Sequence, residues 1–195
     1  CMKLFKSHSY EITKLFVNQI GMTIFGLVLT FSTAMLNPTL KSTFTLVVSI
    51  FSVCFYLYLV YVVGWDYGLK DKVRIESGRL TEDCWLGLKL MAIAQIPNAV
   101  TALLMWLGAI LRAIGGDFCG SVGGILYAIG LPVAEFGQAM YLGIVMRFFN
   151  KEACFLMAGV YTLTMIPPLL ATFLGYWLGV RDIRFLTSPE KHKNK

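Results

Sequence analysis

Residues 43–65 read TFTLVVSIFSVCFYLYLVYVVGW and carry no charged side chain. A helix rises about 1.5 Å per residue, so this stretch is long enough to cross the roughly 30 Å hydrocarbon core of a bilayer. Trp65 closes the stretch, and tryptophan favours the headgroup level of a membrane. The stretch therefore predicts a transmembrane helix and decides the class of the protein.

Four further apolar segments flank this one, at residues 15–36, 85–111, 121–149 and 153–180. Over the whole chain 57% of the residues are hydrophobic and 14% are charged, whereas a soluble domain has roughly 45–50% apolar and 25% charged residues. No Ser/Gly-rich linker divides the chain. We predict an all-α integral membrane bundle with about five transmembrane helices, forming a single domain over residues 1–195.

The first apolar segment could instead be a cleaved signal peptide, because several lysines precede it. Its apolar stretch, residues 15–36, is longer than the roughly 7–15 residues usual for a signal peptide. We therefore favour a first membrane span. Asn18 and Gln19, near the start of this span, are expected at the membrane interface.

A long hydrophilic connection, residues 66–84, lies between Trp65 and Trp85. Lysine and arginine are enriched in cytoplasmic loops, so we expect this connection and the amino terminus to be cytoplasmic. The basic residues of the connection are Lys70, Lys72, Arg74 and Arg79.

The basic carboxyl-terminal tail, residues 181–195, leaves the topology open. Five spans place this tail outside, with nine basic residues inside and seven outside, Lys89 aside. A re-entrant turn at Pro97 in place of the third span gives thirteen inside and three outside. Re-entrant backbone is tolerated only where protein or water surrounds it. We keep five spans as the simpler prediction.

Proline lies near the middle of each of the last three segments, at Pro97, Pro132 and Pro167-Pro168. Proline lacks a backbone donor and bends a helix, so the sequence predicts kinks in these three helices. In membrane proteins such kinks either improve packing or open a polar cavity.

Glu135 is an acid in the middle of an apolar segment. A charged side chain at that depth costs roughly 2.5 kcal/mol or more, so such a residue is a functional candidate. Gln138 lies three residues on, on the same helical face. Gln95 and Asn98 have the same spacing on the preceding segment, at similar depth if the two helices are antiparallel. We predict that these four residues form one intramembrane polar site.

Two readings of this polar site remain open. Glu135 could be a proton or cation site, or it could bind a small solute. Alternatively, a protonated Glu135 could be hydrogen-bonded to the three amides and hold helices together, although such bonds contribute only about 0.6 kcal/mol on average in membranes. The small residues Gly123, Gly130, Ala134 and Gly137 predict a helix-packing seam beside it, which favours an inward-facing Glu135.

Other classes of function find little support in the sequence. It shows no basic and aromatic module for binding nucleic acid. Both histidines lie in the polar tails and the cysteines form no CxxC pair, so we expect no metal site and no cofactor. Protease, phosphate-transfer and P-loop motifs are absent, so we expect no enzymatic activity.

Three patches resemble those of small uncharacterised multi-pass membrane proteins of Firmicutes-type bacteria. They are Trp65-Asp66-Tyr67-Gly68 with Lys70-Asp71, Gly175-Tyr176-Trp177-Leu178-Gly179, and Ile96-Pro97-Asn98. The resemblance implies the bacterial inner membrane as the location, and it implies no activity.

We therefore expect a multi-pass membrane protein, most simply a small transport-related or permease-like subunit that handles a small solute or a proton. The alternative is a non-transporting accessory or assembly protein whose intramembrane polar residues are packing contacts. Five helices are few for a transporter with its own central pathway. We therefore expect a homo-oligomer or a partner membrane subunit in the lipid bilayer.

Overall fold

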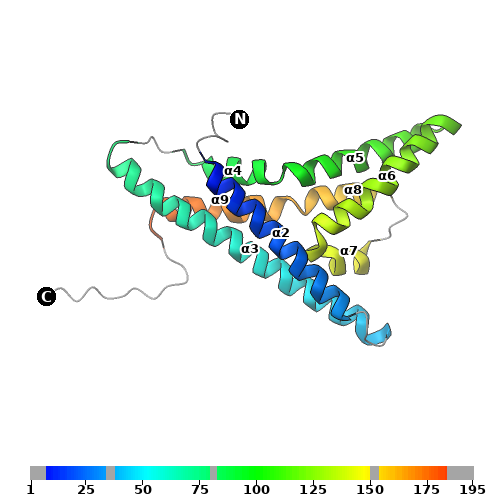
Figure 1. Cartoon of the computed structure of the whole chain (residues 1–195), viewed down its shortest axis with the longest axis horizontal. Coiled ribbons are helices and arrows are strands. Elements are labelled where there is room, and N and C mark those ends of the chain that lie inside the picture. Colours follow the sequence, from blue (N-terminus) through cyan, green and yellow to red (C-terminus); the bar gives the residue numbers. More distant parts are fainter. Residues whose placement is uncertain (1–7, 34–37, 80–82, 150–153, 184–195) are drawn as a thin grey trace.

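The computed structural model describes residues 8–33, 38–79, 83–149 and 154–183, and these form helices and short turns without a strand. Within them, five helices are long and apolar enough to cross a membrane: Ser9–Thr33, Thr43–Glu76, Ile96–Ile114, Asp117–Gly137 and Cys154–Val180. Only 22–28% of the residues in their apolar windows are buried inside the protein, so most of these apolar residues keep part of their surface exposed, as in a helix that contacts lipid. The predicted all-α membrane bundle is confirmed (Figure 1).

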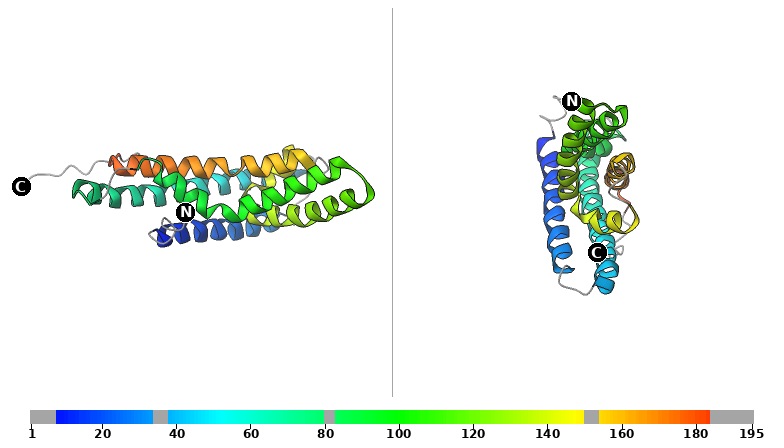
Figure 2. Two further views of the ribbon diagram at one scale, coloured as in Figure 1. Left: turned by 90° about the horizontal axis from the view of Figure 1, so that it is seen from above. Right: turned by 90° about the vertical axis from the view of Figure 1, so that its right-hand side faces the viewer.

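Short connections join the helices. In chain order these are α2 Ser9–Thr33, α3 Pro38–Glu76, α4 Leu86–Ala94, α5 Ile96–Ile114, α6 Asp117–Gly137, the 3₁₀ helix η1 Ala139–Tyr141, α7 Leu142–Phe148, α8 Cys154–Leu163 and α9 Ile166–Val180. Figure 2 shows that they form an elongated bundle, with the hairpin of α5 and α6 at one end of its long axis.

Helix α3 is longer than the sequence predicted. Its 39 residues span about 58 Å at 1.5 Å per residue, whereas the hydrocarbon core is roughly 30 Å thick. We take the membrane-spanning part to end at Trp65, where the apolar run ends. The first part of the predicted hydrophilic connection, through Glu76, therefore continues the same helix.

Helices α3 and α9 approach each other through glycines. A β-carbon on Gly64 would lie 2.6 Å from the carbonyl oxygen of Thr172. Gly68 is equally close to the backbone of α9, and Gly175 and Gly179 are equally close to the backbone of α3. Glycines spaced four apart on both helices allow this close packing of backbones. Two patches noted in the sequence, residues 65–71 and 175–179, thus lie against each other.

The predicted small-residue seam is present between α5 and α6. A β-carbon on Gly123 would lie 2.7 Å from the backbone nitrogen of Arg112, and one on Gly108 would lie 2.8 Å from that of Tyr127. Further along, Gly130 faces Met105 and Ala134 is buried. This seam fixes α6 antiparallel to α5.

The predicted proline kinks are not confirmed. Pro132 lies inside α6, which continues to Gly137 as one helix. Pro97 and Pro167 instead lie in the first turns of α5 and α9, each just after a short helix break. A first-turn position suits proline because the missing N–H has no partner within the helix there.

Both ends of the described chain lie at one end of the bundle, which we call the terminal end. Near the start of α2, His8 is hydrogen-bonded to Tyr67 of α3. After α9, the carbonyl of Ile183 accepts a hydrogen bond of 3.1 Å from Trp65 Nε1. The described chain thus begins and ends at the same end of the bundle, and the basic tail from 184 onward, whose side the sequence left open, lies outside the described residues.

The chain reverses its direction along the bundle within the fourth apolar segment. This segment does not form one helix over residues 121–149. Helix α6 ends where the carbonyl of Gly137 accepts a bond from Thr23, near the middle of α2. Helix α7 then turns back, and Gly143 N donates to Ser49 Oγ at 2.8 Å, close to the start of α3. Helices α6 and α7 thus form a hairpin that enters and leaves at the end opposite to the termini, which we call the hairpin end.

Candidate functional site

Three helix breaks meet in the interior of the bundle. Gln95 separates α4 from α5, Gln138 separates α6 from η1, and the pair Thr164 and Met165 separates α8 from α9. Two of the four predicted site residues are thus the breaking residues themselves. A break frees backbone groups that must find new partners inside a membrane, and this explains why polar side chains lie here.

Gln95 and Asn98 form a buried pair. Asn98 Nδ2 donates a hydrogen bond of 2.6 Å to Gln95 Oε1, and both residues are less than a tenth exposed. The other oxygen of this pair, Asn98 Oδ1, lies against Gly137 at the end of α6. The pair therefore connects the first helix break to the second.

Gln138 connects the second break to the third. Met165 N donates to the carbonyl of Thr162, so the Tyr161 carbonyl lacks its usual helical donor. The Thr164 hydroxyl donates to this carbonyl at 2.9 Å, and Gln138 Nε2 donates to it at 3.4 Å. The Thr164 hydroxyl also lies against Gln138 Oε1, so the carboxamide of Gln138 is bonded to the last turn of α8 and to the break itself.

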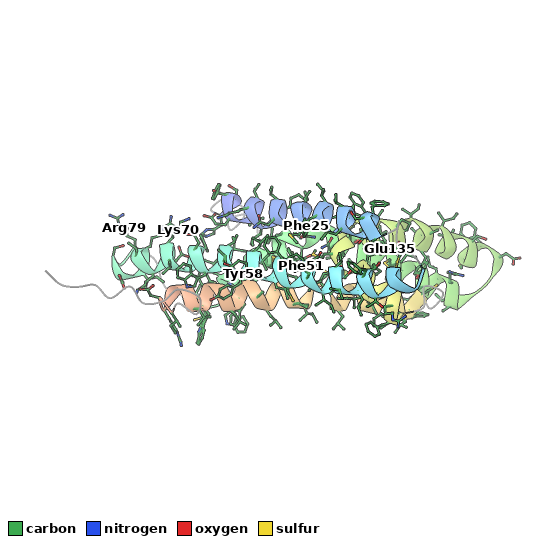
Figure 3. The ribbon with its side chains drawn as sticks, turned by 90° about the horizontal axis from the view of Figure 1, so that it is seen from below. Phe25, Phe51, Tyr58, Lys70, Arg79 and Glu135 are labelled. Carbon is green, nitrogen blue, oxygen red and sulfur yellow. The ribbon has the colours of Figure 1, made fainter. Side chains whose placement is uncertain are left out.

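Glu135 lies one turn before the break at Gln138 and is half-buried. Its carboxyl interacts electrostatically with the hydroxyls of Tyr161 and Tyr127. Figure 3 shows Glu135 in the half of the bundle that lies away from Lys70 and Arg79, toward the hairpin end. Glu135 therefore interacts electrostatically with one tyrosine of α6 and one of α8.

The four predicted residues thus do not make one cluster. Gln95 and Asn98 pair with each other, and Gln138 is bonded to α8. The reason is physical: the Gln138 carboxamide bonds to the break after α8, whereas the Gln95 carboxamide accepts from Asn98, and the sequence pattern did not reveal either partner. All the same, Gly137 joins the groups, since it follows Glu135 by two residues and contacts Asn98.

A cavity of about 220 Å³ opens between α2, α5 and α6, beside this junction. Gln19 lines the cavity and is only 4% exposed, so its side chain faces the interior of the bundle. Its Oε1 atom has no hydrogen-bond partner among the described residues. A polar residue in an apolar helix, as Gln19 is, was the only sign of this site in the sequence. Hydropathy alone does not show which face of the helix packs against other helices.

Several hydroxyl groups of the core also have buried oxygens without a partner among the described residues. They belong to Ser52, Tyr56, Tyr141 and Tyr161. Tyr141 follows the break at Gln138, and Tyr161 precedes the break at Thr164. The interior thus offers hydrogen-bonding groups to a solute in addition to those used for packing.

Sequence reasoning missed a buried carboxylate near the terminal end. Asp71 lies in the part of α3 that continues beyond Trp65, and its side chain is fully buried. Tyr176 Oη donates to Asp71 Oδ2 at 3.2 Å, and Arg74 lies 3.3 Å from the other oxygen. Burial raises the pKa of the Asp71 carboxyl, while the Tyr176 hydrogen bond and the Arg74 charge oppose this rise. The sequence predicts a solvent-exposed connection at this position, so it gives no reason to expect a buried carboxylate there.

No group of three or more histidine, cysteine or acidic residues in the described ranges is placed to hold a metal ion. The arrangement is instead a set of neutral hydrogen-bonding groups at helix breaks with one carboxyl beside them. No protein-family model matches the sequence, no curated protein is significantly similar to it, and no solved structure matches its fold.

Proposed function

We propose that the protein is a small transport-related, permease-like membrane subunit. Its site for a proton or small solute lies at the meeting point of the three helix breaks. The observation that supports this most is the convergence of these breaks: Gln138 bonds to the break at Thr164, and Asn98 contacts Gly137. Discontinuous helices whose broken ends meet near mid-membrane are the usual construction of a transport site.

Glu135 is the residue we assign to the transported charge. It lies one turn from the break and interacts electrostatically with the Tyr161 hydroxyl, whose oxygen is buried without a partner among the described residues. Placing an ionisable group inside a membrane bundle costs free energy, and for this reason such a residue is a candidate for a functional role. The assignment gives the protein no catalytic step.

We also propose that the terminal end is cytoplasmic. Along the sequence, twelve basic residues precede the first apolar segment, lie in residues 66–84 or follow Val180, and we assign these to the terminal end, Lys89 aside. Four flank the other: Lys41, Arg112, Arg147 and Lys151. This bias follows the positive-inside rule, and it agrees with a bacterial inner membrane. In this orientation α6 and α7 form a re-entrant hairpin from the outer side, and Glu135 is reached from outside.

The test is proton flux into liposomes that contain the purified protein and a pH-sensitive dye. A potassium gradient with valinomycin supplies the driving potential. We expect flux above that of empty liposomes, and its loss in Glu135→Gln. The matched control is Asp117→Asn, an exposed acid at the start of the same helix. Equal flux in Glu135→Gln and wild type would refute the assignment of Glu135.

A second candidate function is a non-transporting accessory protein that assembles with a partner or with a second copy. The observation in its favour is that Gln95, Asn98 and Gln138 are all engaged in hydrogen bonds within the bundle. In that case Gln138→Leu should lower the unfolding temperature while no flux is detected in any variant. Measuring mass in detergent by light scattering would show whether a second copy is bound.

A further inference from the structure

We propose that the cavity between α2, α5 and α6 binds an uncharged lipid with a free hydroxyl group, such as a diacylglycerol, from the cytoplasmic leaflet. The inference rests on Gln19 and the walls around it, and it does not depend on transport by Glu135. Only its assignment to a leaflet uses the proposed orientation.

The walls of the cavity suit hydrocarbon. Most of the lining side chains are apolar, and none carries a charge. The lining residues are Phe16, Gln19, Ile20, Thr23, Ile24, Pro97, Asn98, Phe136 and Gly137. A charged headgroup would therefore lose its hydration without gaining an ionic partner, which is costly. The cavity thus selects an uncharged molecule.

The floor of the cavity lacks one hydrogen-bond donor. Thr23 already donates to the carbonyl of Gly137 at 3.0 Å, and Asn98 donates to Gln95. Gln19 Oε1 is left as a buried acceptor without a partner among the described residues. Leaving such an acceptor unpaired costs free energy. A ligand that brings a hydroxyl would satisfy it.

The cavity is open to lipid. Ile20, Ile24 and Phe136 at its rim are 45%, 53% and 61% exposed, on helices whose outer faces are apolar. A lipid can therefore enter sideways from the bilayer.

The depth of Gln19 matches the glycerol level of a lipid. Lys14, five residues earlier, reaches Asp66 beside Trp65 at 3.9 Å. Five residues of helix correspond to about 7.5 Å, so Gln19 lies just below the headgroups of that leaflet. The free hydroxyl of a diacylglycerol lies at this level.

The size of the cavity sets how much of the lipid it holds. Its volume of about 220 Å³ is below the roughly 300–1,000 Å³ of pockets that enclose a drug-sized molecule. It therefore takes the hydroxyl and the adjoining part of one chain, while the rest of the lipid stays in the bilayer.

The test uses the full-length protein in phosphatidylcholine nanodiscs. The probe is a diacylglycerol with a photoactivatable diazirine in one acyl chain, and the adducts are located by mass spectrometry of peptides. We expect adducts to concentrate on residues 16–24 of α2 and near Phe136. Gln19→Leu should reduce this labelling roughly two- to tenfold, the effect of one hydrogen bond, whereas Asn18→Leu should not reduce it.

A competition on the wild-type chain makes the result independent of variant folding. Unlabelled diacylglycerol should displace the probe, and its methyl ether, which cannot donate a hydrogen bond, should compete more weakly by the same factor. Equal competition by the ether would overturn the proposal. Adducts spread evenly over the lipid-facing residues, or unchanged labelling in Gln19→Leu, would overturn it as well.

Discussion

The close approach of α3 and α9 makes Gly64→Ala a severe test of the packing described above. The new β-carbon would lie 2.6 Å from the Thr172 carbonyl oxygen and 3.2 Å from the Tyr176 nitrogen. An ordinary carbon–oxygen contact needs roughly 3.3–3.6 Å, so the two helices must separate by about 0.7 Å or more. Both obstacles are backbone atoms, so no side chain can rotate out of the way.

Two opposing contributions set the change in the free energy of unfolding for Gly64→Ala. Overpacking of a tight core costs about 1–3 kcal/mol, and a rigid backbone on both sides places Gly64→Ala at the upper end. Alanine regains about 1 kcal/mol over glycine inside a helix. We therefore expect a net loss of about 2 kcal/mol in the free energy of unfolding.

The matched control is Gly21→Ala in α2, because nothing lies within 4 Å of a β-carbon there. Only the helix-propensity term acts at this position, so the control should gain up to about 1 kcal/mol. The assay is reversible unfolding in mixed micelles of sodium dodecyl sulfate, followed by tryptophan fluorescence, since Trp65 and Trp177 flank the contact. The reasoning is refuted if Gly64→Ala is as stable as Gly21→Ala.

Three further predictions use other parts of the structure. Tyr56→Phe should raise the free energy of unfolding by about 1 kcal/mol, because it removes a buried hydroxyl without a partner among the described residues; a loss of stability would contradict this. The raised pKa of Asp71 means that its stabilising contribution is greatest below pH ~3.9 and is lost as the pH rises through the raised pKa. The difference in melting temperature between wild type and Asp71→Asn should therefore favour wild type more at pH 4 than at pH 7, and a constant difference would be the contrary result. In intact cells, an impermeant maleimide should label Cys119, at the hairpin end, but not Cys84, before α4; labelling of Cys84 alone would reverse the proposed orientation.

Much of the fold could be predicted from the sequence because hydropathy measures a property that a bilayer imposes. The uncharged run at residues 43–65 has no stable place in water at that length, and the other apolar segments follow the same argument. The seam at Gly123 and Gly130 was also predictable, since small residues at helical spacing allow close contact only on one face.

For the candidate site, the sequence could predict which polar residues lie in apolar segments but not which groups they bond to. A polar residue such as Gln138 in an apolar segment is visible in the sequence, but its partner is not. Here the partner is the Tyr161 carbonyl, which Met165 N leaves vacant and to which the Thr164 hydroxyl also donates. That vacancy depends on the three-dimensional arrangement of α8 and α9. Likewise, Asp71 was read as part of a loop, because charge density in a sequence does not distinguish a solvated loop from a helix that continues beyond the membrane.

The direction of the chain was the least accessible feature, although one signal for it was present. A basic tail after an odd number of spans conflicts with the positive-inside rule, so the charges themselves favoured an even number of crossings. The sequence suggested Pro97 as the turning point, because proline is the strongest breaker of a helix. The structure turns at Gly137 and Gln138 instead, where Thr23 bonds the last carbonyl of α6 and Ser49 bonds the backbone of α7. In this bundle the chain reverses where its freed backbone groups find partners, and those partners lie on α2 and α3, more than ninety residues away in the chain.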